Sequence, residues 1–179
     1  MPTINGKACV ANGTPVDKVF SDGKQVYGRN LLRNSNFSVG DNYANFSNST
    51  GGIITVDNMT ALKIDAKGAV GKNAGIFILA INPPTSQIPQ PCSYQIKIKS
   101  EVDGITAYLG YQGSLTTNCK EIILTTKWQT FKVNGELFTN GNFAFRIYVY
   151  SAATIYVTNC KLEQSNVATP WTPAPEDVM

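Results

Sequence analysis

Apolar and polar residues alternate with a period of two in the stretch 142–157, NFAFRIYVYSAATIYV. One side of this stretch carries Phe143, Phe145, Ile147 and Val149, and the other side carries Ala144, Arg146, Tyr148 and Tyr150. This period is typical of a β-strand with one buried face. The residues Ser151–Thr154 are small and polar enough to turn, and apolar positions resume at Ile155 and Val157. The stretch therefore predicts two antiparallel strands that form a hairpin.

Similar strand-like runs recur along the chain. We predict strands at Arg29–Phe37, Ile53–Asp65 (two strands about Asp57-Asn58), Gly75–Ile81, Ser93–Lys99, Ile105–Tyr111, Glu121–Thr125, Trp128–Val133 and Asn159–Glu163. The runs Glu121–Thr125 and Trp128–Val133 are expected to form a pair. About ten short strands, with turn signals roughly every 8–12 residues and no convincing amphipathic helix, predict an all-β fold. The expected architecture is an antiparallel jelly-roll β-sandwich.

The two ends of the chain differ from this main body. Residues 1–28 contain short β-like runs broken by Asn12-Gly13 and Asp22-Gly23, which favour tight hairpin turns because these residues tolerate positive φ. The segment is too short for its own core, so we expect a β-hairpin or meander that leans on the main domain or on a neighbouring chain. Residues 29–165 form the main domain. Residues 166–179 form a polar, Pro-rich tail or linker held by Trp171.

Composition excludes several kinds of chemistry. Charged residues make up 15% of the chain, below the average of about 25% for globular domains, and histidine is absent. Without histidine there is no Ser-His-Asp or Cys-His nucleophile system and no His-ligated metal site. The cysteines include no Cys-x-x-Cys pair, so no zinc site is predicted. We expect free, mostly buried thiols at Cys9, Cys92, Cys119 and Cys160.

Charge and hydropathy narrow the range of partners. The net charge of +3 comes from scattered lysines and arginines without a basic run, so we predict no nucleic-acid partner. No apolar run approaches about 18 residues, and we predict no membrane span. Met1–Asn12 lacks the apolar segment of a signal peptide. Five Asn-x-Ser/Thr sequons are therefore attributed to an Asn-, Ser- and Thr-rich composition, at Asn12, Asn36, Asn45, Asn48 and Asn58.

The polar side of the 142–157 stretch supplies candidate binding residues. Tyrosine offers a flat apolar ring and a hydroxyl, and arginine offers a rigid fork of donors, so together they suit hydroxyl-rich ligands. The candidate carbohydrate-binding set adds residues of other strands, expected beside this row, and two aromatics of a polar loop: Tyr43, Phe46, Gln95, Lys97, Tyr108, Gln112, Arg146, Tyr148 and Tyr150. The alternative is that this face packs against the second sheet or against residues 1–28, which would make the tyrosines core residues.

A catalytic role is not predicted. A glycoside hydrolase needs two carboxylates across a cleft, at a separation set by its mechanism. Most carboxylates of this chain lie in predicted turns, and no two of them have an obvious claim to form such a pair. We therefore expect a protein that is not an enzyme.

Short motifs carry a family resemblance. Residues 30–37, NLLRNSNF, resemble the Asn-Leu-Leu-x-Asn-x-x-Phe opening of carbohydrate-binding modules in tail proteins of bacteriophages that infect Gram-positive bacteria. Lys161-Leu162-Glu163 and residues 168–177, ATPWTPAPED, are similar to the closing signature of these modules. Residues 91–94, PCSY, and 127–131, KWQTF, resemble two internal strand motifs, with Cys92 in place of the usual glycine. The resemblance covers about residues 29–177.

The resemblance implies a non-catalytic jelly-roll module that binds cell-wall or envelope saccharides of the host. Its expected place is the virion, at the phage tail tip, with other tail and baseplate proteins as partners. Residues 1–28 resemble small N-terminal pieces of tail proteins from phages of lactic acid bacteria. The competing hypothesis is a structural tail or baseplate domain without a saccharide ligand, whose tyrosine face contacts another protein.

The same module shape raises the question of a metal. Modules of this shape often hold a structural calcium near the two termini, bound by carboxylate and carbonyl oxygens. The ligands expected in that case are Asn36, Asp65 and Glu163, and no other cofactor is implied. The alternative role of Glu163 is a hydrogen bond to the backbone of the first strand.

Overall fold

The computed structural model of the protein is built almost entirely from β-strands. It describes residues 7–38, 43–45, 48–67, 74–79, 90–111, 119–137 and 144–178, with only the backbone described at 43–45, 77–79, 111, 136–137 and 144–145. Within these residues the one helix is a 3-10 turn, η1, at Pro175–Asp177. No helix in this part of the chain has the length and apolar character needed to cross a membrane.

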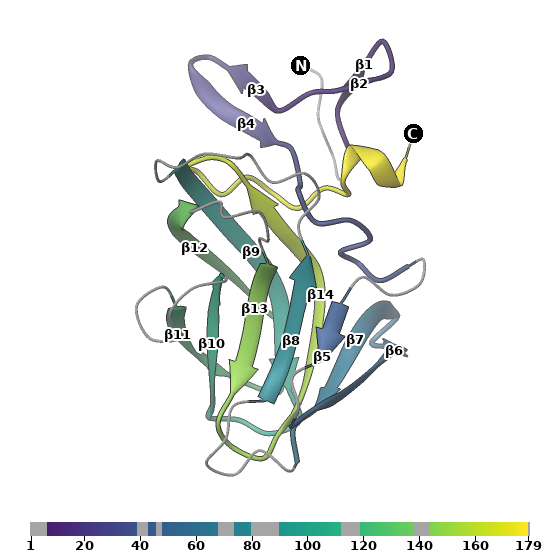
Figure 1. The fold of residues 1–179 in the computed structure, drawn as a ribbon, viewed down its shortest axis with the longest axis vertical. Coiled ribbons are helices and arrows are strands. Elements are labelled where there is room, and N and C mark those ends of the chain that lie inside the picture. The colour runs from purple at the N-terminus through teal and green to yellow at the C-terminus, as the bar shows by residue number, and fades with distance from the viewer. Residues whose placement is uncertain are drawn as a thin grey trace.

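Two five-stranded antiparallel sheets face each other (Figure 1). Sheet A has the strand order β11 (Cys119–Leu124), β10 (Ile105–Tyr111), β13 (Ala144–Val149), β8 (Ala74–Leu79) and β5 (Tyr43–Asn45). Sheet B has the order β12 (Gln129–Leu137), β9 (Gln90–Ser100), β14 (Thr154–Glu163), β7 (Met59–Asp65) and β6 (Thr50–Val56). The predicted all-β sandwich is confirmed.

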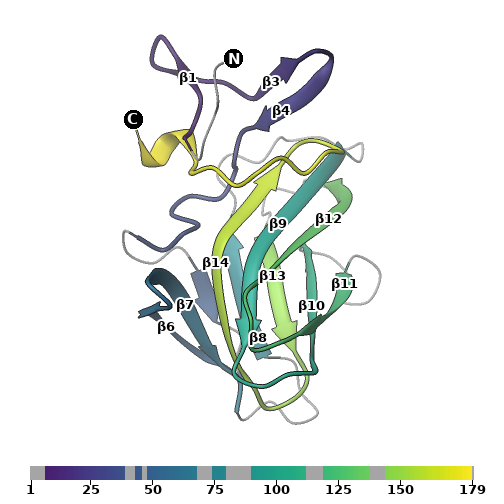
Figure 2. The same ribbon diagram turned by 180° about the vertical axis from the view of Figure 1, so that it is seen from behind.

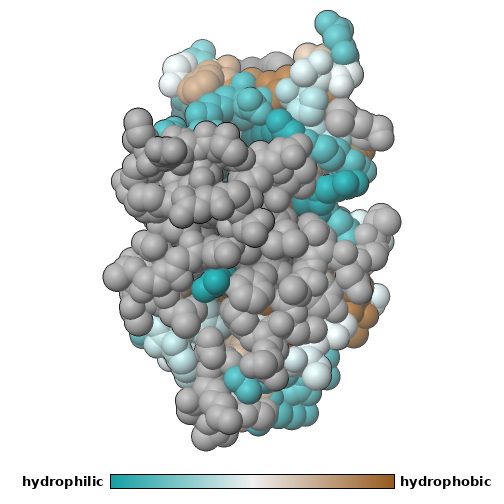
Figure 3. Space-filling model, viewed as in Figure 1, coloured by the Kyte–Doolittle hydropathy of each residue, from teal (hydrophilic) through white to brown (hydrophobic). Residues whose placement is uncertain are grey.

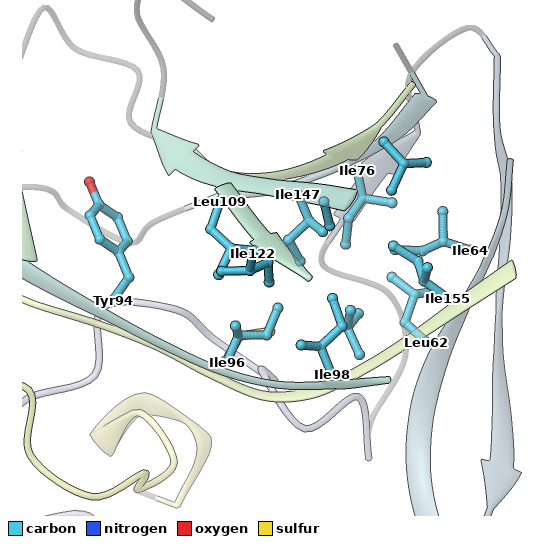
Figure 4. Close-up of a cluster of buried hydrophobic side chains, with 14 of the residues drawn as sticks. Leu62, Ile64, Ile76, Tyr94, Ile96, Ile98, Leu109, Ile122, Ile147 and Ile155 are labelled. Carbon is cyan, nitrogen blue, oxygen red and sulfur yellow. The ribbon is translucent and has the colours of Figure 1, made fainter. Parts of the chain in front are cut away.

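The core lies between the sheets and is rich in isoleucine (Figure 4). Sheet A contributes Ile76, Leu109, Ile122 and Ile147, and sheet B contributes Leu62, Ile64, Ile96, Ile98 and Ile155. β-Branched side chains pack well on a pleated surface, which is why these segments form strands. Each fully buried side chain of this size stabilises the fold by about 1.5–3 kcal/mol. Along the predicted strands Ser93–Lys99 and Ile105–Tyr111, Ile96 and Ile98, and Ala107 and Leu109, are buried at a period of two.

Three tight turns adopt positive φ at both central residues. Asn12-Gly13 joins β1 (Val10–Ala11) to β2 (Thr14–Pro15), and Asp22-Gly23 joins β3 (Lys18–Ser21) to β4 (Lys24–Gly28). Asp57-Asn58 joins β6 to β7, with φ of 49° and 60°. Two successive residues of positive φ characterise the type I′ turn, whose twist suits a hairpin. All three predicted turns are confirmed.

The prediction that residues 142–157 form a hairpin is wrong. Both strands exist, but β13 belongs to sheet A and β14 to sheet B, so the link between them crosses from one sheet to the other. Val149 and Ile155 both point into the core, from opposite sides. The expected pair Glu121–Thr125 and Trp128–Val133 is wrong for the same reason, because β11 pairs with β10 and β12 pairs with β9.

The predicted first strand, Arg29–Phe37, is also wrong. Leu32 forms one isolated bridge and residues 33–36 are a turn, with positive φ at Asn34 (44°) and Phe37 (58°). Leu31, Leu32 and Phe37 are nevertheless buried in the core, as their apolar character indicates. The segment reaches the core as a turn because one buried side chain, Asn30, supplies the hydrogen bonds that a strand would have made.

Asn30 is fully buried and uses its whole amide. Its Oδ1 accepts from the backbone N–H groups of Leu32 (3.1 Å) and Leu162 (3.2 Å). Its Nδ2, which has two N–H groups to donate, lies within hydrogen-bond distance of three acceptors: the carbonyls of Cys160 (3.1 Å) and Thr172 (3.0 Å) and the Ser35 hydroxyl (3.0 Å). A single side chain therefore joins the turn after the N-terminal extension, the last strand and the C-terminal segment.

The last strand needs this help because β7 covers only its first part. The β14–β7 pairing runs from Thr154 to Val157, and beyond it β14 has an irregularity between Thr158 and Lys161, with Asn159 at a φ of 50°. The edge left open is covered by residues 30–35, where Leu31 N–H donates to the Leu162 carbonyl and Cys160 N–H donates to the Ser35 carbonyl. Buried backbone groups must be paired, so this contact replaces a missing strand.

A buried ion pair lies on the outer face of β14 after the irregularity. Lys161 and Glu163 are each 1% exposed, with Nζ 3.8 Å from Oε2. The Thr169 hydroxyl connects them, because it accepts from Lys161 Nζ (2.7 Å) and donates to Glu163 Oε2 (2.8 Å). The same hydroxyl accepts from the Gly28 N–H (3.1 Å), which ties in the N-terminal extension.

Glycine is required at position 28. A Cβ placed there would lie 1.6 Å from Glu163 Oε2, so no larger residue fits while the carboxylate is in place. Burial lowers the pKa of Lys161 to about 8, with the Glu163 carboxylate opposing the shift. Burial also raises the pKa of Glu163, which Lys161 and the Thr169 hydrogen bonds partly offset.

The C-terminal segment folds back over sheet B at the end nearest the N-terminal extension (Figure 2). Ser165, Thr169, Thr172 and Ala174 are buried, and Trp171 Nε1 donates to the Ser35 hydroxyl (3.2 Å). Arg29 forms ion pairs with Asp17 of the extension and with Glu176 of η1. The anchoring contact predicted for Trp171 is thus present, within a segment that is packed along its length.

All four cysteines are free thiols, as expected. Cys92 and Cys160 are buried, whereas Cys9 and Cys119 are half-buried. Burial raises the pKa of the Cys160 thiol, which keeps it protonated and unreactive.

Replacing Asn30 with alanine should lower the free energy of unfolding by about 3–5 kcal/mol, because several buried backbone groups lose their partners at once. Urea denaturation followed by tryptophan fluorescence would measure this. Asn36→Ala is the matched control. Among the described residues, its Oδ1 accepts from the N–H and hydroxyl of Ser38 near the surface, and the substitution should cost about 1 kcal/mol. Equal losses in the two variants would contradict the role assigned to Asn30.

The buried lysine should give the protein a stability that rises in alkali. Between pH 8 and 10.5 the unfolded chain binds more protons at Lys161 than the folded chain does, so the free energy of unfolding increases with pH there, by about 1–3 kcal/mol. Denaturation of wild type and Lys161→Met from pH 7 to 10 isolates this contribution as a difference. The difference should grow in favour of wild type with pH, whereas Lys127→Met, at an exposed lysine, should show no such trend.

Candidate functional site

A cluster of three tyrosines lies on the outer face of sheet A. Tyr148 of β13 and Tyr108 of β10 are direct register partners, and Tyr150 follows the end of β13. The rings of Tyr108 and Tyr148 stack with centroids 5.1 Å apart. Tyr150 meets both rings edge-on, at 5.5 Å from each. Stacked and edge-to-face contacts of this kind hold aromatic rings in fixed orientations.

The three tyrosines differ in exposure. Tyr148 is 1% exposed, Tyr108 is half-buried and Tyr150 is 41% exposed. Tyr148 is thus the buried support of the cluster, and Tyr108 and Tyr150 present the accessible ring surface. The alternative that these side chains pack against sheet B is wrong, since they point away from it; Tyr148 alone is buried as a core residue would be.

A depression of about 430 Å³ opens beside the accessible rings. Its lining residues come from the β9–β10 turn, β10, β11 and the end of β13: Gly104, Thr106, Tyr108, Glu121, Tyr150 and Ser151. Glu121 is the register partner of Tyr108 on the edge strand β11. The site therefore combines two phenol rings, the aliphatic hydroxyls of Thr106 and Ser151 and one carboxylate, at the end of sheet A opposite the N-terminal extension (Figure 1).

The phenols of Tyr108 and Tyr148 keep their protons at neutral pH because the pKa of each is raised. Burial raises the pKa of Tyr148, and the neighbouring Cys119 thiol adds to the shift. Burial and then the charge of Glu121 raise the pKa of Tyr108. Each protonated phenol has one O–H to donate and a lone pair to accept with, while the carboxylate only accepts. The site can therefore satisfy hydroxyl groups, which are donors and acceptors at once.

Arg146 lies two residues before Tyr148 on the same face of β13. Its register partners are Gly110 of β10 and Phe77 of β8, and the residue is half-buried. The structure thus brings together four residues of the predicted set: Tyr108, Arg146, Tyr148 and Tyr150.

Gln95 and Lys97 do not lie beside this row, and that part of the prediction is wrong. Both belong to β9 of sheet B, on the outer face of the opposite sheet. Gln95 is buried beneath the C-terminal segment, where its amide can donate to the Thr169 carbonyl and accept from the Trp171 N–H. Lys97 Nζ lies 3.1 Å from the Met59 sulfur and 5.7 Å from the centre of the Trp128 ring.

Three other predicted positions are not settled by side-chain geometry. Phe46 and Gln112 lie outside the described residues. Tyr43 begins β5 and pairs with Ile78 of β8 through its backbone. Their roles in saccharide binding stay predictions.

The three candidate metal ligands do not form one site. Asp65 is the register partner of Thr154 at the start of β14, and Glu163 is nine residues further along the strand, roughly 30 Å away at about 3.3 Å per residue. The Glu163 carboxylate accepts hydrogen bonds from the N–H and hydroxyl of Thr169, and not from the backbone of residues 29–37 as the alternative expected. The Asn36 side-chain oxygen accepts from the Ser38 N–H. The described residues contain no group of three or more Asp, Glu, Cys or His side chains able to hold a metal. These residues do not fit a shared calcium.

Another aromatic side chain, that of Trp128, lies on the outer face of sheet B, where Asp57 and Lys99 contact it. Trp128 Nε1 donates to Asp57 Oδ2 (2.8 Å), in the turn between β6 and β7. Asp57 also pairs with Lys99 at 2.5 Å, and Lys99 Nζ lies 5.2 Å from the centre of the Trp128 ring. These hydrogen bonds lower the pKa of Asp57, with Lys99 as the larger cause. The ring is occupied by its own neighbours and offers little platform for a ligand.

Glu121 is the one charged residue among the described residues that line the depression, and it is missing from the predicted binding set. The alternation of β11 places it on the outer face, because Ile122 and Leu124 are buried. What the sequence lacks is the pairing of β11 with β10, which brings the carboxylate to Tyr108.

Comparison with solved structures identifies proteins of the same fold. A family 11 carbohydrate-binding module from Clostridium thermocellum, in complex with a β-1,3-1,4-mixed-linked tetrasaccharide, is similar with a TM-score of 0.53 and 12% identity, over 77% of this chain and 94% of that chain. A putative sugar binding protein from Bacteroides thetaiotaomicron has a TM-score of 0.57 and 11% identity, over 76% and 100%. TmCBM61 in complex with β-1,4-galactotriose has a TM-score of 0.53 and 12% identity, over 77% and 100%.

Some similar structures are parts of glycoside hydrolases. An arabinose-bound GH51 α-L-arabinofuranosidase has a TM-score of 0.55 and 16% identity, and the match covers 80% of this chain but 27% of that enzyme. No protein-family model and no curated protein matches the sequence. Identities this low show the fold alone. This chain has the jelly-roll β-sandwich fold that is found in carbohydrate-binding modules.

Proposed function

We propose that this protein is a non-catalytic saccharide-binding module, and that its ligand occupies the depression beside Tyr108 and Tyr150. The observation that carries the proposal is the joining of two accessible rings and the Glu121 carboxylate around one depression of about 430 Å³. That volume is in the range of about 300–1,000 Å³ typical of small-molecule sites.

The chemistry of the depression suits a neutral sugar unit. The apolar face of a tyrosine ring covers the C–H face of a pyranose, and the buried Tyr148 holds the other two rings in place. Glu121 accepts hydrogen bonds from sugar hydroxyls, and the phenols donate or accept. A shallow site of this kind binds with about 4–6 kcal/mol, in the tens of micromolar to millimolar range. Several copies on one particle would then supply avidity.

The carboxylates of the depression argue against a glycoside hydrolase. Glycoside hydrolysis by the usual route needs two carboxyl groups flanking the scissile bond. Among the described residues that line the depression, Glu121 is the one carboxylate.

The biological setting we propose follows the family resemblance of the sequence. The module would belong to the tail tip of a phage of Gram-positive bacteria and bind the polysaccharide of the host cell surface. The motifs at residues 30–37 and 161–177 support this setting. In the structure, residues of both motifs contact each other beside β14. Asn30 of the first motif and the Lys161, Glu163 and Thr169 side chains of the second form the contacts that close the fold.

One observation favours a second candidate function, contact with another tail or baseplate protein. The N-terminal extension, β1–β4, exposes apolar surface at its end of the molecule (Figure 3). Phe20 is 60% exposed there, and Val10 and Val26 are each more than a third exposed. A partner that covers this surface is compatible with saccharide binding at the opposite end of sheet A.

Replacing Tyr150 with alanine should weaken saccharide binding about tenfold, equivalent to about 1.4 kcal/mol, without unfolding the protein. The measurement is binding of the fluorescently labelled protein to intact Gram-positive cells, with displacement by a panel of soluble monosaccharides. Glu121→Gln keeps the shape of the site and should shift which sugar displaces best. Tyr156→Ala, on the outer face of sheet B, is the matched control and should bind as wild type does.

Suppose that a sugar displaces the protein from cells, and that Tyr150→Ala binds these cells as well as wild type does. The saccharide site would then lie elsewhere on the molecule. If no cell or sugar binds even a multivalent display of the protein, the saccharide function fails and the protein-contact function of the extension takes its place.

A further inference from the structure

A second cleft opens at the edge of the sandwich and has none of the tyrosine cluster in its lining. The edge strands β11 and β12 lie on the same side of the molecule and are joined directly by residues 125–128 (Figures 1 and 2). The cleft has a volume of about 520 Å³. It is lined by Lys120, Lys132, Val133, Asn134, Asn166, Val167 and Ala168.

The polar groups of this cleft are mainly donors. Lys132 Nζ donates to the Ala168 carbonyl (3.2 Å), which leaves two of its three N–H groups for a ligand. The Asn134 amide donates to the Asn166 carbonyl (3.1 Å) and accepts from the Ser93 hydroxyl (3.2 Å), so one N–H of its NH₂ group is left. These contacts also hold the 166–168 segment in position against β12.

The cleft carries two lysines, and the nearest buried charges that act on Lys132 are the paired Lys161 and Glu163, whose charges are opposite. Among the described lining residues there is no carboxylate, and neither Lys120 nor Lys132 makes an ion pair with any described residue. Other lysines on the same side of sheet B have such partners, since Lys99 pairs with Asp57 and Lys161 with Glu163. Two cations that make no such ion pair, beside an amide donor, favour an anion.

The two lysines suit a phosphate monoester. An ammonium group is a compact point charge that binds phosphate, and a phosphate monoester carries a charge of about −1.5 to −2 at neutral pH against −1 for a carboxylate, so two cations match the phosphate better. No arginine is among the described residues of the lining. The apolar side chains of Val133 and Val167 give the cleft a surface on which the carbon skeleton of an organic phosphate can lie.

We propose that this cleft binds a phosphate group carried on a saccharide. The cleft and the tyrosine depression share the edge strand β11: Lys120 lines the cleft and Glu121, the next residue, lines the depression. Successive residues of a strand point to opposite faces, so a polymer that passes around this edge reaches both. If the proposed saccharide function holds, its ligand is a phosphate-bearing polysaccharide, with a neutral unit on the rings and a phosphate between the lysines.

The test is a titration of the isotope-labelled full chain with glucose 1-phosphate, followed by backbone amide NMR signals. We expect shifts at Lys120, Lys132–Asn134 and Asn166–Ala168, no comparable shifts with glucose, and weaker binding of glucuronate. Lys120→Gln combined with Lys132→Gln should raise the Kd at least tenfold. Lys24→Gln combined with Lys127→Gln removes the same charge from exposed lysines elsewhere and should leave the Kd unchanged.

Several results would overturn the proposal. Equal weakening by the two double variants would mean that net charge alone attracts the phosphate. If the NMR signals of the cleft residues do not shift at tens of millimolar glucose 1-phosphate, the cleft is not a phosphate site. If glucuronate binds as tightly as glucose 1-phosphate, the cleft has no preference for phosphate.

The tyrosine depression is tested separately in the same titration. Tyr150→Ala should leave the glucose 1-phosphate shifts at the cleft intact. Failure of that variant to affect neutral sugars would therefore count against the depression and not against the cleft.

Discussion

The fold depends on pairing the backbone of one half-covered strand. β14 lies in the middle of sheet B, yet β7 accompanies it only as far as Val157. Beyond that point its buried N–H and C=O groups would be orphaned, at a cost of about 1–3 kcal/mol each. The Asn30 amide and the turn that follows it satisfy them instead. A side-chain amide has the same donor and acceptor as a peptide group, so it can stand in for a missing neighbour strand.

This arrangement explains why both ends of the chain are part of the fold. The Asn30 turn arrives from the N-terminal extension, and Thr172, whose carbonyl Asn30 also binds, belongs to the C-terminal segment. The Thr169 hydroxyl repeats the pattern on the outer face, where it joins Gly28 to Lys161 and Glu163. A buried ion pair is weak evidence for stability by itself, because desolvation opposes the attraction. Here the pair has a definite geometric role, since its hydrogen bonds to Thr169 hold the C-terminal segment against β14 beside Gly28 of the N-terminal extension.

The strands and the core residues were predictable because alternation directly reports which side chains are buried. The turns at Asn12-Gly13, Asp22-Gly23 and Asp57-Asn58 were predictable because few residues tolerate positive φ. Sheet membership was not, since Val149 and Ile155 show the same alternation whether their strands pair or face each other. That single gap accounts for the misplaced Gln95 and Lys97 and for the missed contact between Glu121 and Tyr108. The strand predicted at Arg29–Phe37 failed because a buried Asn side chain leaves no periodic signature.

The location of the chain ends has a consequence for how the molecule meets a surface. The N-terminal extension and η1 lie together at one end of the sandwich (Figure 1), and the turns that border the tyrosine depression, at Gly104 and Ser151, lie at the other. If the protein is attached to a particle through its N-terminal extension or its C-terminal segment, as in the proposed setting, its long axis points outward and the rings of Tyr108 and Tyr150 face the surface that the particle approaches. The two sheets then lie between the attachment point and the rings, so a small rotation at the attachment point would move the rings through an arc and let them reach neighbouring positions on a repetitive target.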